Sequence, residues 1–193
     1  MNILEADSDS LLKAVRALLE QKGIVSTAEV TERMAITDNA SPGQGARMVA
    51  KAWLDPAYRA LMLEDGTKAA EALDIPMRGM PPLGVLENTT DIHNLVVCTL
   101  CSCYPRAVLG YPPFWYKSAA FRARAIRDPR ELLASEWKTI IPDTTKLRVV
   151  DSTADYRWMV LPVRPAGTET WDEAQLAAIV RDGDMIGVTI PAT

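Results

Sequence analysis

The stretch VCTLCSCYP, residues 97–105, contains every cysteine of the 193-residue chain: Cys98, Cys101 and Cys103. Thiolates are both nucleophiles and ligands for soft metal ions, so the cluster can carry chemistry in two ways. Pairing within the chain would leave one cysteine over, and structural disulfides are rare in the cytoplasm, where we expect this protein. The spacing therefore favours a metal site.

Zinc and iron–sulfur clusters fit this stretch poorly. Structural zinc usually takes four ligands from two separated pairs of residues, and iron–sulfur clusters usually take four thiolates. Here there is one group of cysteines, and His93 is the only histidine that could complete a zinc site. Three inert cysteines are also improbable, because chance would rarely place them within six consecutive positions.

The CSC sequence suits a different ligand set. The amide nitrogens of Ser102 and Cys103 lie between the sulfurs of Cys101 and Cys103 along the chain. These two nitrogens and two sulfurs can therefore chelate one ion in a plane. Cys98 can then reach an axial position and leave the opposite position open for a reactant. Backbone amides lose their protons only to a strongly polarising ion, which indicates a trivalent metal that acts as a Lewis acid.

With these ligands in view, VCTLCSCY resembles the metal-binding signature of nitrile hydratase alpha subunits. Four further segments resemble the same family, and together they cover nearly the whole chain: ENTTDIHNLVVCTLCSCYP, PPFWYKSAAFRARAIRDPRELL, RVVDSTADYRWMVLPVRPAGTE and GARMVAKAWLDPAYRALMLEDGT. The resemblance implies hydration of a nitrile to an amide at a non-corrin cobalt(III) or non-haem iron(III) centre, with one ion per chain.

The resemblance also implies a role for each residue of the motif. Cys98, Cys101 and Cys103 would supply sulfurs, and Ser102 and Cys103 would supply amide nitrogens. Cys101 would be oxidised to a sulfinic acid and Cys103 to a sulfenic acid, both reachable by cysteine oxidation. Catalysis would polarise the nitrile or deliver an oxygen to its carbon, and that oxygen would come from hydroxide or from the Cys103 sulfenate.

Two positions inside the motif bear on the choice of metal. Family members with threonine and tyrosine at the places of Thr99 and Tyr104 tend to be cobalt enzymes, whereas iron enzymes tend to have serine and threonine. The resemblance therefore favours cobalt(III), with iron(III) as the alternative.

Two departures from the family pattern lie beside the motif. The family usually has tryptophan where this chain has Arg106, and a glutamine that faces the active site is missing from the segment GMPPLG, residues 79–84. A cation beside the pocket favours a polar substrate, so we expect a bulky polar or heteroaromatic nitrile. His93 is expected to support the site or the fold rather than to react, because metal centres depend on such supporting residues.

The resemblance implies a beta subunit as partner, either a single chain or one split in two, and possible loading of cobalt by an activator protein. A related alternative is the metal-binding subunit of thiocyanate hydrolase, whose anionic substrate would suit Arg106. A non-enzymatic alternative is a protein that only holds cobalt.

Composition sets the remaining limits. The net charge of -4 and the lack of a basic run argue against nucleic acid as a partner. No apolar stretch approaches the roughly 20 residues that cross a bilayer. The first residues, MNILEADSDS, lack the order of a secretory signal, so we expect a cytoplasmic protein without membrane attachment.

The sequence patterns on either side of the cysteines predict helices and strands in one chain, which is an α+β fold. Residues 1–75 read as a helical arm, with an apolar face along residues 11–19 that ends at Gly23, and a capping box at Ser26 and Glu29. Asp55 and Pro56 begin another helix. Residues 76–193 read as a mixed α/β body with layered sheets and helices, and the cysteines follow directly on a strand.

Further elements are expected in the body. Runs rich in valine, isoleucine and methionine predict strands at 146–152, 156–165 and 185–190. A helix is expected between the last two, with Thr170 and Glu173 as its capping box. Asp128 is expected to cap the helix that follows it.

Overall fold

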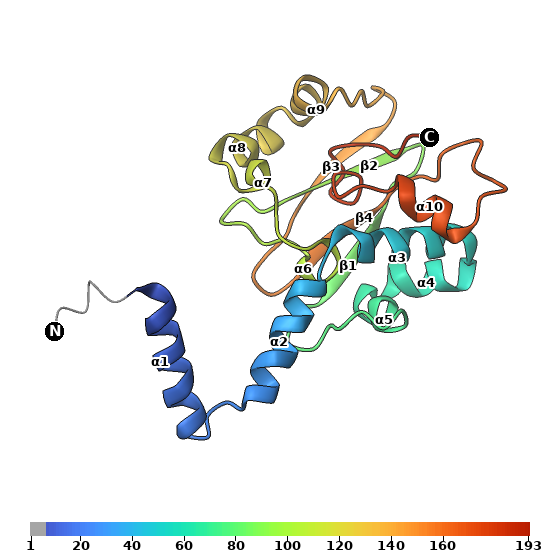
Figure 1. The fold of residues 1–193 in the computed structure, drawn as a ribbon. Helices are drawn as coiled ribbons and strands as arrows, with labels where there is room; N and C mark the ends of the chain where they lie inside the picture. Colours follow the sequence, from blue (N-terminus) through green and yellow to red (C-terminus); the bar gives the residue numbers. More distant parts are fainter. Residues whose placement is uncertain (1–6) are drawn as a thin grey trace. The chain divides into compact units, whose positions relative to one another are not determined.

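The computed structural model describes residues 7–193 and divides at Asn39 and Ala40 into two compact units. Its helices and strands run in this order (Figure 1): α1 (Ser8–Gln21), α2 (Thr27–Asn39), α3 (Pro42–Leu54), α4 (Pro56–Glu64), α5 (Gly66–Glu71), β1 (Leu83–Glu87), β2 (Ile92–Val97), α6 (Arg106–Leu109), α7 (Phe114–Lys117), α8 (Ala119–Arg127), α9 (Pro129–Trp137), β3 (Lys146–Asp151), β4 (Arg157–Leu161) and α10 (Glu173–Ile179). Helices and short sheets share one chain, which confirms the α+β class.

The first unit consists of α1 and α2, and neither helix has a buried residue. The predicted capping box is present, because the Ser26 amide donates to Glu29 Oε2 at 2.8 Å and the Glu29 amide donates to Ser26 Oγ at 3.1 Å. The apolar face of α1 stays open, with Leu12 66% exposed. This unit therefore keeps its helices by capping and local pairing rather than by a core.

Helices α3, α4 and α5 lie in the second unit, whereas the sequence pattern predicts one helical arm over residues 1–75. Met48 and Met62 are fully buried, and Trp53 Nε1 donates to the Pro162 carbonyl at 2.8 Å. Asp55 caps α4 as expected and accepts from the Ala57 amide at 2.9 Å. These helices pack on α10 and β1 because their apolar faces need a partner surface.

Two pairs of parallel strands form the centre of the second unit. β1 pairs with β4, with Leu83 opposite Arg157, and β2 pairs with β3, with Val97 opposite Asp151. Because the strands in each pair are parallel, the residues at their carboxyl ends meet at the same edge. The end of β2 is therefore placed beside the end of β3, directly before Cys98.

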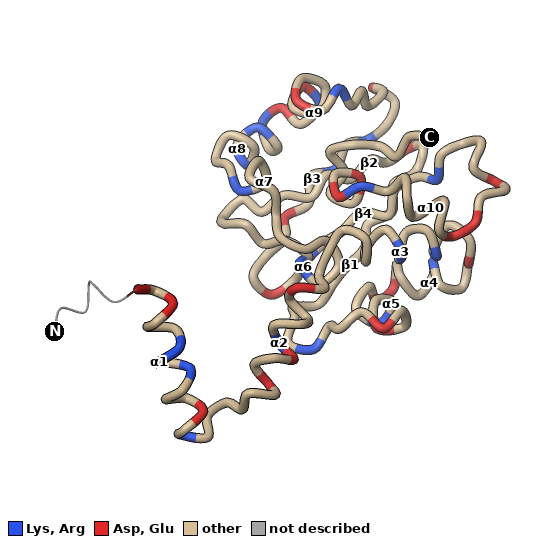
Figure 2. The backbone as a smooth tube through the Cα atoms, in the orientation of Figure 1, with Lys and Arg blue, Asp and Glu red and all other residues tan. Residues whose placement is uncertain are grey.

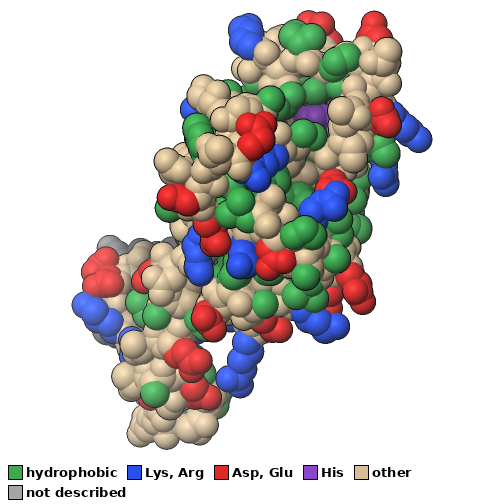
Figure 3. All heavy atoms as spheres, turned by 90° about the vertical axis from the view of Figure 1, so that its right-hand side faces the viewer, with side chains coloured by type: hydrophobic (Ala, Val, Ile, Leu, Met, Phe, Trp, Pro, Cys, Tyr) green, Lys and Arg blue, Asp and Glu red, His purple; other side chains and the backbone are tan. Residues whose placement is uncertain are grey.

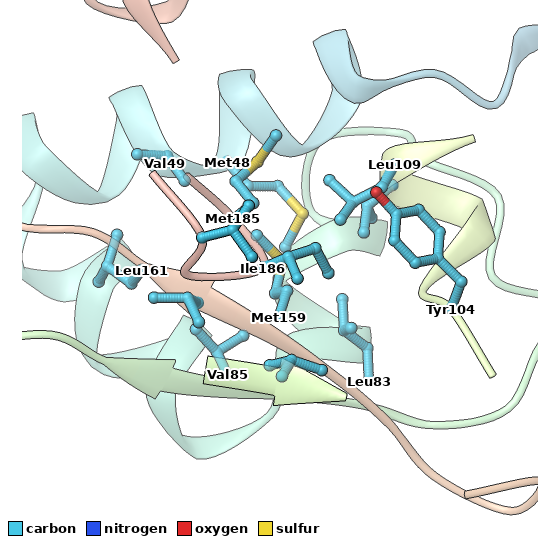
Figure 4. Close-up of a cluster of buried hydrophobic side chains, with 14 of the residues drawn as sticks. Met48, Val49, Leu83, Val85, Tyr104, Leu109, Met159, Leu161, Met185 and Ile186 are labelled. Atoms are coloured by element: carbon cyan, nitrogen blue, oxygen red, sulfur yellow. The ribbon is translucent and has the colours of Figure 1, made fainter. Parts of the chain in front are cut away.

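The core lies between α3 and the strands. In Figure 4, Met48 of α3, Leu83 of β1, Met159 of β4 and Met185 point toward one another, and Tyr104 lies at the edge of this cluster beside Leu109. Methionine fills irregular gaps because its side chain is flexible and polarisable.

The expected strand at 185–190 does not form. Met185 instead accepts from the Val160 amide of β4 at 2.8 Å, and Ile186 accepts from the Val96 amide of β2 at 2.8 Å, so the turn inserts between the two strand pairs. Gly187 has φ +85°, and a Cβ there would lie 1.9 Å from the Asn94 carbonyl oxygen. The apolar run is thus buried as a glycine-dependent turn rather than as a strand.

The capping box expected at Thr170 and Glu173 was also misplaced by two residues. α10 is capped by Asp172, which accepts from the Gln175 amide at 2.8 Å, and the Gln175 side chain accepts from the Asp172 amide at 3.0 Å. Asp128 precedes α9 as expected, but its carboxylate lies 3.5 Å from Arg124 Nε instead of bonding the backbone.

Charged residues of both signs are spread over the backbone, and α8 and α9 carry basic and acidic residues close together (Figure 2). Within residues 7–193, no helix is long and apolar enough to cross a membrane.

Candidate metal centre

The three cysteine sulfurs meet in the loop that follows β2. Cys98 and Cys103 are buried, at 1% and 8% exposed, whereas Cys101 is exposed. The Cys101 sulfur lies 3.4 Å from that of Cys98 and 3.2 Å from that of Cys103, and all three lie within 4.8 Å of one another. The loop thus brings three soft donor atoms to one point.

The backbone of the loop turns toward the same point. The Cys101 amide donates to the Cys98 sulfur at 3.3 Å. The pKa of the Cys101 thiol is lowered, chiefly by its hydrogen bonds with Cys103 and Cys98 and further by the Ser102 and Cys103 amides. The Ser102 and Cys103 amides, which are the expected nitrogen donors, thus belong to the same short turn as the three sulfurs, which fits a site of mixed sulfur and nitrogen ligands.

Cys103 has a contrasting environment. Burial, followed by its hydrogen bonds with the other two cysteines, raises the pKa of its thiol to about 12, while the positive charge of Arg157 acts in the opposite direction. The thiol of Cys103 thus stays protonated unless a metal ion or another positive charge stabilises its thiolate.

Asp151 holds the start of the loop. Its carboxylate accepts from the Thr99 amide at 3.0 Å and from Thr99 Oγ1 at 2.5 Å. Asp151 ends β3 opposite Val97, so the parallel pairing of β2 and β3 places its carboxylate beside the loop. Arg122 of α8 donates to the Thr99 carbonyl at 3.3 Å, which fixes the opposite side of the same peptide segment.

Aromatic residues hold the end of the loop. Tyr116 is fully buried and its hydroxyl donates to the Cys103 carbonyl at 2.9 Å. The ring of Tyr104 packs edge-on against that of Tyr116, with ring centroids 4.9 Å apart. The buried aromatic residues beside the motif thus shape the loop, while Tyr111 and Phe114 are exposed.

A small cavity lies beside the loop. It is lined by Tyr104, Arg106 and Arg157 and by apolar side chains from residues 77–83. Arg106 is exposed, and its guanidinium carbon lies 4.9 Å from the centre of the Tyr111 ring. Both departures from the family pattern, Arg106 and the segment GMPPLG, thus contribute to the wall of the same cavity.

His93 lies near the opposite end of β2 from Cys98. Its Nε2 is 2.8 Å from the Gly187 carbonyl oxygen and its Nδ1 is 3.2 Å from Asn88 Nδ2. Burial lowers the pKa of the imidazole. Figure 3 shows the histidine, purple, enclosed by other side chains. These contacts assign His93 a part in the fold.

Sequence reasoning missed three residues that the structure places at the loop: Asp151, Arg122 and Arg157. The signal for Asp151 was available, because an aspartate directly after the apolar run of a strand commonly lies at a sheet edge where sites form. Nothing in the sequence pattern distinguished Arg122 or Arg157 from the other arginines around them.

Known proteins share this sequence and fold. Residues 6–189 match the family described as nitrile hydratase, alpha chain. The chain is 46% identical over 183 residues to the low-molecular weight cobalt-containing nitrile hydratase subunit alpha of Rhodococcus rhodochrous, covering 94% of this chain and 88% of that one.

Two groups of solved structures are similar as well. A recombinant thiocyanate hydrolase with partially modified cobalt centers matches with a TM-score of 0.83 and 40% identity, over 97% of this chain and 92% of that one. A double mutant of the Fe-type nitrile hydratase from Comamonas testosteroni Ni1 matches with a TM-score of 0.79 and 38% identity, over 96% and 92%. The three sulfurs thus lie in a fold shared along its whole length, and the chain belongs to the nitrile hydratase alpha-chain family.

Proposed function

We propose that this chain is the metal-binding catalytic subunit of a nitrile hydratase, which adds water to a nitrile and releases the amide. The observation that carries the proposal is the convergence of the Cys98, Cys101 and Cys103 sulfurs within 4.8 Å of one another at the end of β2. Cobalt(III) bound there would supply a Lewis acid for the reaction.

The residues present fit such an ion. Thiolate sulfur suits a soft metal site, and the Ser102 and Cys103 amides lie in the same short loop as the three sulfurs, so sulfur and nitrogen donors are close together. Cys98, Cys101, Ser102 and Cys103 would hold the ion. Among residues 7–193 no histidine or carboxylate joins the cysteines in a group of potential metal ligands, which disfavours the usual zinc sets.

The surrounding residues would orient the ligands. Asp151 and Arg122 fix the Thr99 peptide segment, and Tyr116 fixes the Cys103 carbonyl, so both ends of the loop are held by hydrogen bonds. Positioning of this kind keeps ligand atoms in place before a metal or substrate arrives, which reduces the reorganisation needed at the reaction.

Cobalt is proposed in preference to iron. The support is Thr99 and Tyr104 within the motif and the 46% identity to a subunit named as cobalt-containing. Oxidation of Cys101 to sulfinic acid and of Cys103 to sulfenic acid is part of the same proposal. The exposed Cys101 is the more accessible of the two thiols to an oxidant.

The active form is proposed to be a complex with a beta subunit, single or split into two chains, and an activator protein is proposed to load the cobalt. Support comes from the apolar side chains around the loop, since Leu100 is 88% exposed and Phe114 is 92% exposed. Large apolar side chains exposed beside a reactive site are typical of a surface that another chain covers.

The test is to purify the chain with its partner from cobalt-supplemented cells and to measure metal content, intact mass and amide formation. One cobalt per chain, two or three added oxygens on the peptide with Cys101 and Cys103, and amide production would support the proposal. Zinc with unmodified thiols in the active complex, or no amide from any nitrile, would contradict it.

Thiocyanate hydrolysis is the second candidate, and Arg106 is the observation that favours it. A guanidinium at the cavity beside the loop would attract an anionic substrate. The thiocyanate hydrolase structure with a TM-score of 0.83 adds support. Assay of thiocyanate beside nitriles separates the two candidates.

We further propose a bulky polar or heteroaromatic nitrile as substrate. The support is the replacement of an apolar wall by Arg106, together with the methionine-rich segment that lines the same cavity. A complex that hydrates small aliphatic nitriles as efficiently as a large heterocyclic one would contradict this specialisation.

A further inference from the structure

The cavity beside the cysteine loop has two kinds of wall. One wall is apolar and comes from Met77, Met80 and Leu83, and the other comes from two cationic residues, Arg106 and Arg157. No carboxylate lines it among the described residues, and neither arginine has an ion pair in that part of the chain. A recess lined by two cationic side chains and by no carboxylate favours an anion.

Arg157 supplies the stronger indication. Its Nη1 is buried and has no hydrogen-bond partner in the structure. A buried donor that lacks a partner raises the free energy of the folded chain, and a ligand oxygen placed there would remove that cost. The Tyr104 hydroxyl also lacks a partner, but it lies beside Leu109 in Figure 4, so Tyr104 contributes its ring to the wall.

The place of the cavity links it to the cysteines. Tyr104 and Arg106 line the cavity together with Arg157, and they follow Cys103 in the chain by one and three positions. A substrate bound with one end at the cysteine loop can therefore place its other end in the cavity.

The volume limits what enters. The cavity measures about 60 Å³, and a buried water needs about 10–15 Å³ on the same scale. The cavity thus holds a group of a few heavy atoms, such as a carboxylate, and the remainder of a larger molecule stays outside it.

We propose that Arg106 and Arg157 form a subsite that binds a carboxylate carried by the nitrile substrate at the end away from the nitrile. This inference rests on the proposed nitrile hydratase activity. It makes Arg106 a residue that determines specificity for charged nitriles, with Met77, Met80 and Leu83 beside the carbon atom that carries the carboxylate.

The experiment uses the cobalt-loaded complex and three nitriles of matched size. These are 3-cyanopropanoate, its neutral amide, and 4-methylpentanenitrile, in which an isopropyl group replaces the carboxylate. We expect the wild-type complex to favour 3-cyanopropanoate. Arg106→Gln should lower kcat/KM for 3-cyanopropanoate by about tenfold, mainly through KM, because one charge-assisted hydrogen bond is lost. Its effect on 4-methylpentanenitrile should stay within about twofold.

Arg127→Gln is the matched control, because Arg127 is an exposed arginine on α8 that does not line the cavity. It should leave all three rates unchanged. Since a variant could lose activity through misfolding, butanoate is also tested as an inhibitor of 4-methylpentanenitrile hydration. Arg106→Gln should weaken that inhibition while 4-methylpentanenitrile is still hydrated.

The outcomes separate the two proposals. If 4-methylpentanenitrile is hydrated at least as well as 3-cyanopropanoate, or Arg106→Gln lowers both equally, the subsite is wrong and the hydratase activity stands. If no nitrile is hydrated, or only thiocyanate is consumed, the proposed function fails and the subsite fails with it.

Discussion

The two ends of β2 carry polar clusters of opposite character. At one end, His93 and Asn94 are 4% and 1% exposed, and their ring and amide nitrogens bond to Asn88, Glu87 and Gly187. At the other end, the Cys98, Cys101 and Cys103 sulfurs are close mainly to one another. The nitrogens of the histidine cluster have hydrogen-bond partners, although Asn94 Oδ1 has none, and such a cluster stabilises a fold. A cluster of donors directed at one point is suited to a ligand.

The histidine end also shows which protonation state the fold selects. The Asn88 Oδ1 accepts from the Asn94 amide at 2.7 Å, so the Asn88 amide nitrogen faces His93 Nδ1. His93 Nε2 therefore carries the proton and donates to the Gly187 carbonyl. A second proton on Nδ1 would meet another donor, and burial adds to the cost, so the neutral ring is favoured.

Removing a sulfur at one end of β2 should have the largest effect. We expect Cys98→Ala to abolish metal retention and amide formation, because the loop loses its buried sulfur ligand. Metal content after gel filtration and the rate of hydration measure it. The matched change at the other end, His93→Gln, should keep the metal. Equal metal loss in both variants would show that the two clusters are not distinct.

Removing the carboxylate that holds the loop should have an intermediate effect. Asp151→Ala loses both hydrogen bonds to Thr99, and we expect metal affinity or activity to fall by about 10–100-fold. Metal release to a chelator and the extent of cysteine oxidation provide readouts that separate positioning from catalysis. Asp155→Ala, at an exposed position after the same strand, is the control. Identical chelator kinetics in both variants would contradict a role for Asp151 in holding the loop.

The histidine end should respond to pH through stability. The folded-state pKa of His93 lies below its usual 6.5, so the unfolded chain binds a proton that the folded chain does not. The contribution of His93 to the free energy of unfolding is therefore present above about pH 6.5 and is lost as pH falls, by up to about 1.4 kcal/mol per pH unit. Urea unfolding between pH 7.5 and 5.5 measures this. In His93→Gln the pH dependence should be shallower, and an unchanged slope would refute the assignment.

The smallest effect is expected from Thr99→Ser. Serine retains the hydroxyl and the amide that bond to Asp151, so the loop should keep its shape and its metal. The cobalt-to-iron ratio after growth with both metals measures any preference set by the methyl group. A large loss of total metal would show that the methyl group, rather than the hydrogen bonds, holds the loop.

Some local signals in the sequence were confirmed where one short segment contains all the interacting groups, although the equally local capping box at Thr170 and Glu173 and the Asp128 cap were not. The Ser26–Glu29 capping box and the Asp55 cap require residues only two or three positions apart. The cysteine cluster is of the same kind, because Cys98, Cys101 and Cys103 meet through the turn of their own loop. Signals that depend on a partner surface were misjudged, as in the apolar run at 185–190, which is buried between β2 and β4 as a turn.

The sequence by itself therefore determined the cysteine cluster that is proposed to hold the metal, the α+β class and the family. Only the tertiary structure decided that β3 brings Asp151 to Thr99, that α8 brings Arg122, and that β4 brings Arg157 to the cavity beside Cys103. The physical reason is separation along the chain. Residues some fifty positions apart meet through strand pairing and packing, and no local pattern records which partner a strand or helix will find.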